Sequence, residues 1–375
     1  MRAIRKCLVS LSALAVLAAA PAMAEEGGST RALDDALAAG YKAAFICSST
    51  FNAGQTLEEI RQNELSGIYP DYQRSFDKLP DAMIDPARKL VSVTYSNAMP
   101  PRMAAWRPGF GCTQLPIGAE EGALNFLPRF AAWPDFSGED RGSAIGSNVK
   151  VQLRIEEAER LEAPVSFAFD ERTYGNGTRT SAVVVVKDGQ VVAERYARGI
   201  DHETPQRTWS VAKSISATIL GAARRNGHID LDYPAVIADW NNGADPRREI
   251  TLRDLMQMAS GLDSGEEGSR TDRIYFGGGR VVDQAASKVM EAKPGTRFKY
   301  SNNDTLIAMR SFRESLGADD SYHRFPYEKL LHKIGAVHTT LEVDWNGDFV
   351  SSSQVWSTAR DLARVGQLYL QDGVW

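Results

Sequence analysis

The chain has 375 residues, of which 43% are hydrophobic and 24% are charged, and its formal net charge is −5. This is the composition of a globular protein, long enough for one large domain or two modest ones. The acidic balance argues against nucleic-acid binding, because no basic run occurs beyond the N-terminus.

The first 24 residues have the pattern of a secretory signal peptide. Three basic residues among the first six precede an apolar segment over 7–20, and small residues follow at 22–24. The apolar segment is shorter than the roughly 20 residues that span a bilayer, which argues against a membrane anchor. We therefore expect cleavage near Glu25, no stable membrane insertion, and secretion into a bacterial periplasm.

The segment 25–165 is expected to be an N-terminal extension that carries little chemistry. Signal cleavage would remove Cys7 and leave Cys47 and Cys112, an even pair in an oxidising compartment. We expect these two to form a structural disulfide, because neither has a neighbouring histidine or a Cys-x-x-Cys spacing.

The same segment predicts a few short elements. Residues 43–47 are apolar and predict a strand, and Thr56 begins a capping box that predicts a helix ending near Gly67. Strands are predicted over 90–95 and 103–107, on either side of a proline turn. The loops over 116–146 are left unassigned.

The second half of the chain is more regular. Strands over 181–186 and 190–196 flank Asp188-Gly189, a hairpin signal. The first strand is continuously apolar, so we expect it in the middle of a covered sheet. Helical periodicity predicts further helices over 209–227, 251–258, 304–316, 327–334 and 357–370.

Ser210 and Lys213 are the first candidate catalytic residues. A helix that begins near residue 209 places them one turn apart, with apolar residues 211, 215, 219 and 222 turned toward a core. Burial lowers the pKa of a lysine, which can then activate a serine at a helix N-terminus. Ser-x-x-Lys also occurs at 75–78 and 147–150, but neither of these begins a long apolar helix. The alternative for Ser210 is an ordinary helix start.

Tyr300 and Asn302 form the second candidate site element. They follow a Pro-Gly turn and precede a predicted helix, although Tyr-x-Asn also occurs at Tyr95 and Tyr174. A tyrosine beside Lys213 can shuttle protons for the serine and the leaving group. The alternative is a buried tyrosine that bonds to the backbone.

Together these motifs resemble the penicillin-recognising serine hydrolases. This group comprises class C β-lactamases, D-Ala-D-Ala carboxypeptidases, related esterases and, with the greatest likeness, 6-aminohexanoate-dimer hydrolases. The likeness covers 178–375 and rests on the hairpin and on Trp-Ser-Val-Ala-Lys-Ser at 209–214, Thr-Leu-Arg-Asp-Leu-Met at 251–256, Ser-Gly-Leu at 260–262, Tyr-Ser-Asn at 300–302 and Ser-Thr-Ala-Arg-Asp-Leu-Ala-Arg at 357–364.

The resemblance implies roles for these residues. Ser210 would be the acylated nucleophile, and its N–H would be half of the oxyanion hole. Lys213 would be the general base, Tyr300 the acid/base partner and Asn302 a contact to a substrate amide. The substrate would be a small amide or ester, and no cofactor would be required. The oligomeric state stays open.

The implied fold is α/β (α+β) over 166–375. It is a β-lactamase/DD-peptidase-like three-layer sandwich with an antiparallel sheet, helices on both faces and a helical subdomain. The family also carries a Lys-Thr-Gly-type motif on a later strand, and the chain ends before that strand. We therefore expect a truncated sequence with an incomplete sheet. Loss of one oxyanion donor alone removes about 10²–10³ in rate.

From this truncation we expect the 375-residue chain alone to be poorly soluble and without serine-dependent hydrolysis. Two alternatives to an enzyme stay open, a non-catalytic penicillin-recognising module and an inactive fragment. No metal site is expected, because the five histidines lack ligand spacing. The run at 277–279 is expected to be a flexible loop rather than a phosphate cradle.

Overall fold

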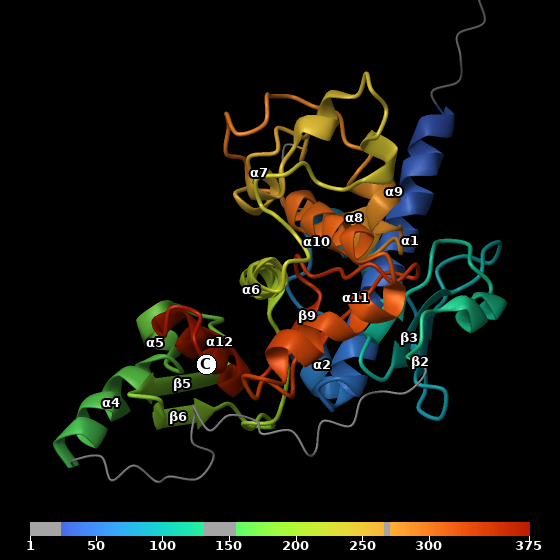
Figure 1. Ribbon diagram of the computed structural model, residues 1–375. Coiled ribbons are helices and arrows are strands. Elements are labelled where there is room, and N and C mark those ends of the chain that lie inside the picture. Colours follow the sequence, from blue (N-terminus) through green and yellow to red (C-terminus); the bar gives the residue numbers. More distant parts are fainter. Residues whose placement is uncertain (1–23, 131–154, 266–270) are drawn as a thin grey trace, which may run out of the picture.

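The computed structural model describes residues 24–130, 155–265 and 271–375. Figure 1 shows these parts as ribbons. Most of the predicted signal peptide, residues 1–23, lies outside the described residues. So do residues 131–154, which include the end of the unassigned loops and the Ser-x-x-Lys at 147–150. Within the described residues, no helix is both long and apolar enough to cross a bilayer.

A long N-terminal helix, α1 (Ala24–Phe51), is followed by two short helices and a four-stranded antiparallel sheet in the order β1-β2-β3-β4. The bounds are α2 (Leu57–Asn63), α3 (Pro70–Phe76), β1 (Met83–Asp85), β2 (Leu90–Val93), β3 (Arg102–Arg107) and β4 (Gly111–Gln114). The capping box at Thr56 and the two strands predicted from the sequence are confirmed.

The predicted strand over 43–47 is wrong, because these residues belong to α1. The five-residue apolar run fits either a strand or a buried helix, and the residues around it decide. One face of α1 packs into the main core through Leu37, Tyr41 and Phe45. Another face, with Ala43 and Cys47, packs on the four-stranded sheet. A helix buried on two faces shows no simple amphipathic stripe.

The predicted hairpin is confirmed as β5 (Ala182–Lys187) and β6 (Gln190–Tyr196). Asp188 and Gly189 have φ of 51° and 74°, the pair of positive values that a type I′ turn requires. Two helices pack against it, α12 (Ala359–Leu370) on β5 and α4 (Ile155–Phe167) on β6.

The expectation that the first hairpin strand lies in the middle of a covered sheet is wrong. Among the described residues β5 pairs with β6 alone, and its side chains are half-buried. A continuous apolar run shows that a strand is shielded, but it does not specify whether strands or helices provide the cover.

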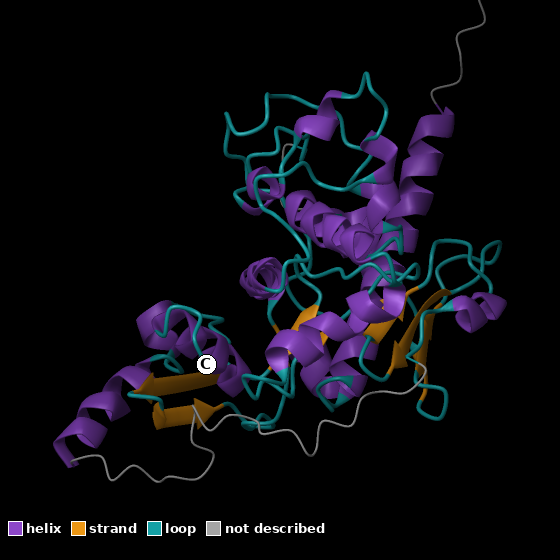
Figure 2. Ribbon diagram, in the orientation of Figure 1, coloured by secondary structure: helices purple, strands orange, loops and turns teal. Residues whose placement is uncertain are grey.

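The remaining strands form a short sheet in the order β7-β9-β8, and Figure 2 shows strands gathered in three separate places. The strands are β7 (Gln206–Arg207), β8 (Thr340–Leu341) and β9 (Val355–Ser357). The α-helices not yet named are α5 (Glu171–Tyr174), α6 (Ala212–Arg225), α7 (Leu252–Met256), α8 (Asp272–Tyr275), α9 (Val281–Gln284), α10 (Asn302–Leu316) and α11 (Asp319–Pro326). Single turns of other types are η1 (Glu121–Phe126), η2 (Trp209–Val211), η3 (Ala238–Trp240), η4 (Pro246–Glu249) and η5 (Tyr327–Leu331).

Helices combined with antiparallel sheets are the α/β (α+β) class that the sequence predicted, and this class is confirmed. The main hydrophobic core takes side chains from α1, α6 and α10. The segment expected to be an extension therefore shares its core with the later helices. The domain boundary at 165 stays a prediction, and helix α4 runs across it.

Candidate active site

Ser210 lies in a tight turn between β7 and α6, and its side chain is exposed. The residue before it, Trp209, has a φ of 46°, in the left-handed region that a bulky residue rarely adopts. Thr208 ties the start of the turn to β9, because its N–H and its hydroxyl both donate to the Val355 carbonyl at 2.9 Å. Local strain of this kind persists only where the surroundings hold it.

Lys213 lies one turn after Ser210, and its ammonium donates three hydrogen bonds. Nζ is 3.1 Å from Ser210 Oγ, 2.6 Å from Asn302 Oδ1 and 2.8 Å from the Ser352 carbonyl oxygen. Burial lowers the pKa of Lys213, and the neighbouring Tyr300 partly offsets this effect. The amine is thus fixed in place and loses its proton more readily than an exposed lysine does.

Tyr300 reaches the same serine from the loop before α10. Its hydroxyl donates to Ser210 Oγ at 2.6 Å, and its ring centroid is 5.0 Å from Lys213 Nζ. Burial raises the pKa of Tyr300, but the hydrogen bonds to Ser210 and Lys213 outweigh it, so the net shift is downward. Asn302, the first residue of α10, is buried.

Lys213 and Tyr300 thus both contact the Ser210 hydroxyl, and Asn302 joins this group through Lys213. One detail of the prediction is wrong, because Val211 is exposed rather than buried. Residues 209–211 form a tighter turn, so α-helical periodicity begins only at residue 212. The buried face of the helix consists of Ala212, Ile215, Ser216, Ile219, Leu220 and Ala223.

Sequence reasoning missed the segment 351–353, which contacts Lys213 and the helix α6 that carries it. Ser352 supplies its carbonyl to the lysine, and its hydroxyl is 2.6 Å from the buried Tyr275 hydroxyl. Ser216 on α6 donates to the carbonyl of Ser351 at 2.9 Å. The run of three serines at 351–353 was the available signal. A backbone carbonyl, however, is independent of residue type and leaves no mark in a sequence.

A second missed pair lies behind the Tyr300 loop. The Ser260 hydroxyl donates to Asp304 Oδ1 at 2.9 Å, and the Asp304 N–H donates to the hydroxyl of Ser301, the N-cap of α10. Burial raises the pKa of Asp304 to about 6, although the bonds from Ser260 and Ser301 oppose the rise. This carboxyl joins the start of α10 to the loop after α7.

Within the described ranges, no group of three or more His, Cys, Asp or Glu side chains is arranged to hold a metal ion. The predicted flexible loop at 277–279 follows α8, and a side chain at Gly278 would meet the Leu115 backbone carbonyl at 2.3 Å. Glycine there permits close packing of two backbone segments.

Comparison with known proteins gives a consistent result. A model of the beta-lactamase family matches residues 167–374. The 6-aminohexanoate-dimer hydrolase of Paenarthrobacter ureafaciens is 27% identical over 225 residues, which are 52% of this chain and 53% of that protein. The chain thus spans about half the length of the curated relative it matches.

Two solved structures can be named beside these. A candidate 6-aminohexanoate-dimer hydrolase from Bacillus anthracis is 27% identical with a TM-score of 0.46, over 52% of this chain and 55% of that one. A class C beta-lactamase is 16% identical with a TM-score of 0.44, over 58% of this chain and 66% of that one.

Proposed function

Because the chain belongs to the beta-lactamase family, we propose that it carries the acylation machinery of a serine hydrolase for amide or ester bonds. Ser210 is the nucleophile in this proposal. The observation that supports it most directly is that Lys213 Nζ and the Tyr300 hydroxyl both lie within hydrogen-bond reach of Ser210 Oγ, at 3.1 and 2.6 Å.

In the proposed reaction the neutral amine of Lys213 accepts the Ser210 proton as Oγ attacks the substrate carbonyl carbon. The carbonyl oxygen becomes an oxyanion, which the Ser210 N–H helps to stabilise. The bond to the leaving amine or alcohol then breaks, and the Tyr300 hydroxyl gives that group its proton. The proton held by Lys213 returns to Tyr300, and an ester of Ser210 remains.

Asn302 has two tasks in this proposal. Its side-chain oxygen accepts from Lys213 at 2.6 Å, which orients the amine toward Ser210. A contact to a substrate amide, as expected from the sequence, then falls to its Nδ2 group. That group donates, so the natural partner is a substrate carbonyl oxygen.

The test follows acylation of Ser210, because acylation is the first covalent step of the proposed reaction. The purified chain is mixed with p-nitrophenyl acetate, nitrophenolate release is followed by absorbance, and the acetylated peptide is identified by mass spectrometry. We expect one acetyl group on the peptide that contains Ser210, and none in Ser210→Ala. Lys213→Met should slow acylation by about 10²–10⁴-fold, the range of a general base.

Ser214→Ala is the matched control, because Ser214 is an exposed serine on the same helix. It should react as the unaltered chain does. Equal acetylation of Ser210→Ala and the unaltered chain would overturn the proposal. A fluorescent penicillin that acylates Ser210 without later release would identify a penicillin-recognising module, whereas steady release of 6-aminohexanoate from its dimer would identify an amide hydrolase.

A further inference from the structure

A residue outside the family match lies against the turn that carries Ser210. Phe45 belongs to α1, far before the matched range 167–374, and it is 1% exposed. Its ring centroid is 5.7 Å from that of Trp209. The Arg207 guanidinium lies over the same Phe45 ring at 3.6 Å.

Arg207 extends this contact to the rest of the turn. Its guanidinium is 5.3 Å from the Trp209 ring and 5.3 Å from the Trp356 ring on β9. It donates to Gln354 at 2.8 Å, and among the described residues its Nε and Nη2 have no hydrogen-bond partner. This buried cation therefore packs against aromatic faces. Burial raises the pKa of Glu64 and Glu342, and the charge of Arg207 opposes this rise.

The packing acts on the one strained residue of the turn. Trp209 has a φ of 46°, a conformation that persists only where the surroundings fix it. Its side chain is 37% exposed, so one side faces solvent and Phe45 and Arg207 contact the other. Rotation about this residue would displace Ser210, the next residue, from both Lys213 and Tyr300.

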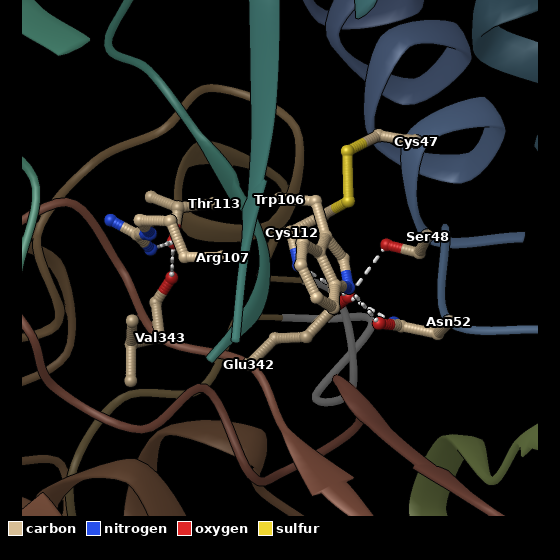
Figure 3. Close-up of a disulfide and its surroundings, with 9 residues drawn as sticks. All are labelled: Cys47, Ser48, Asn52, Trp106, Arg107, Cys112, Thr113, Glu342 and Val343. Carbon is tan, nitrogen blue, oxygen red and sulfur yellow. Dashed lines mark hydrogen bonds between the residues drawn. A yellow bond between two sulfur atoms is a disulfide. The ribbon is translucent and has the colours of Figure 1, made fainter. Parts of the chain in front are cut away.

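The end of α1 that carries Phe45 is itself fixed to the same region (Figure 3). The buried carboxylate of Glu342 accepts from Ser48 at 2.6 Å, from Asn52 at 2.9 Å and from the Cys112 N–H at 3.1 Å. The Glu342 N–H donates to the Gln354 carbonyl at 2.9 Å, and Gln354 is the residue that holds Arg207. The part of α1 that carries Phe45 is therefore fixed by hydrogen bonds to the segment that also holds Arg207.

We propose that Phe45 is a positioning residue, through which α1 holds Trp209 and Arg207 so that Ser210 points at its base. The inference rests on the proposed role of Ser210 as nucleophile. In this role Phe45 acts through the turn that carries Ser210 and does not itself contact the substrate. A misplacement of about 1 Å at a reacting atom can cost about 10²-fold in rate, so a modest change in the packing of Phe45 has a measurable effect.

The test compares Phe45→Ala and Phe45→Leu with Leu37→Ala, whose side chain is buried in the same core two turns earlier on α1. The readout is acetylation of Ser210 by p-nitrophenyl acetate, separated into saturation constant and limiting rate. We expect Phe45→Ala to lower the limiting rate by about 10–100-fold with little change in the saturation constant. Phe45→Leu keeps apolar volume without a ring, so its limiting rate should fall between those of Phe45→Ala and the unaltered chain. The limiting rate of Leu37→Ala should stay within about 3-fold of that of the unaltered chain.

Hydrogen exchange of the peptide over 206–213 provides a readout that needs no activity. Phe45→Ala should speed its exchange, and Leu37→Ala should not. Equal effects of Phe45→Ala and Leu37→Ala on both readouts would overturn the inference. The proposed function would still stand in that case if Ser210→Ala is not acetylated. If Ser210→Ala is acetylated like the unaltered chain, the proposed function fails instead, and exchange alone decides whether Phe45 holds the turn.

Discussion

At the scale of single residues, the proposed reaction depends on Lys213 as the base for Ser210. Its three hydrogen bonds to Ser210, Asn302 and the Ser352 carbonyl use all the protons of an ammonium. Burial lowers its pKa and Tyr300 raises it, so two opposing effects of known sign act on one amine. This balance gives a pH dependence that can be tested.

The prediction concerns Tyr300→Phe. If Lys213 is the base, acetylation of Ser210 rises with pH as Lys213 loses its proton, and the midpoint of the rise follows the lysine pKa. Tyr300 raises that pKa. Its replacement by phenylalanine should therefore move the midpoint to lower pH. The limiting rate should fall less than in Lys213→Met, because nitrophenolate leaves without needing a proton from Tyr300.

The measurement is the acetylation rate of both proteins across the alkaline range. A midpoint that moves to higher pH in Tyr300→Phe would contradict the assignment of Lys213 as base. If the acetylation rate of Tyr300→Phe no longer rises with pH, the group that titrates is Tyr300 rather than Lys213. The unaltered protein reports the coupled pair rather than either residue alone.

How much of this site a sequence can predict depends on the type of contact. Ser210, Lys213, Tyr300 and Asn302 carry distinctive side chains in motifs, and the fold brings these four side chains together. The positive φ of Trp209 was not predictable, since nothing local distinguishes it. Contacts from α1 and from 351–353 depend on long-range packing, which local spacing does not encode.

At the scale of elements, the start of α10 and the loop after α7 are joined by a carboxyl group. Ser260 donates to Asp304 through its hydroxyl, and Ser301 caps the helix one turn before. The sequence predicted both helices within a few residues. It missed α1 because the two-sided burial of that helix removes the periodic signal. It placed the apolar strand β5 in the middle of a sheet, whereas among the described residues β5 pairs with β6 alone.

Asp304→Asn should change how stability depends on pH. The folded-state pKa is about 6, and the unfolded value is about 3.9. Between these values the unfolded chain loses its proton first, so the folded state binds more protons and the free energy of unfolding falls as pH rises. The loss is complete above about pH 7 and amounts to at most about 3 kcal/mol.

The asparagine variant cannot ionise at this position. Its stability relative to the unaltered protein should therefore increase between about pH 4 and 6 and then level off. Urea unfolding at a series of pH values measures the difference, and Asp239→Asn, at an exposed aspartate, is the control. A difference that does not vary with pH would contradict the raised pKa of the buried Asp304 carboxyl.

At the scale of the whole molecule, the N-terminal segment is integral to the fold that carries the site. A disulfide joins Cys47 on α1 to Cys112 on β4, and the Cys112 N–H donates to Glu342 (Figure 3). Glu342 also bonds to Ser48, to Asn52 and to the segment before β9. The predicted pairing of the two cysteines is present. One buried cluster thus connects the first helix, the four-stranded sheet and the strand behind Ser210.

Reduction of this disulfide should destabilise the molecule as a whole. The bond closes a loop over a sequence separation of 65 residues, and loops of such length give about 2–4 kcal/mol by restricting the unfolded chain. Urea unfolding with and without dithiothreitol measures the change in the free energy of unfolding. Because the same protein is used in both measurements, the two states differ in sequence nowhere and in bonding only at the two sulfur atoms. Cys47→Ala/Cys112→Ala should unfold at lower urea and show no further effect of reductant. An unchanged urea midpoint in the reduced protein would contradict this prediction, because the Glu342 cluster and the core would then hold α1 without the disulfide. In that case the hydrogen exchange of residues 206–213 in the reduced protein should match that of the oxidised protein.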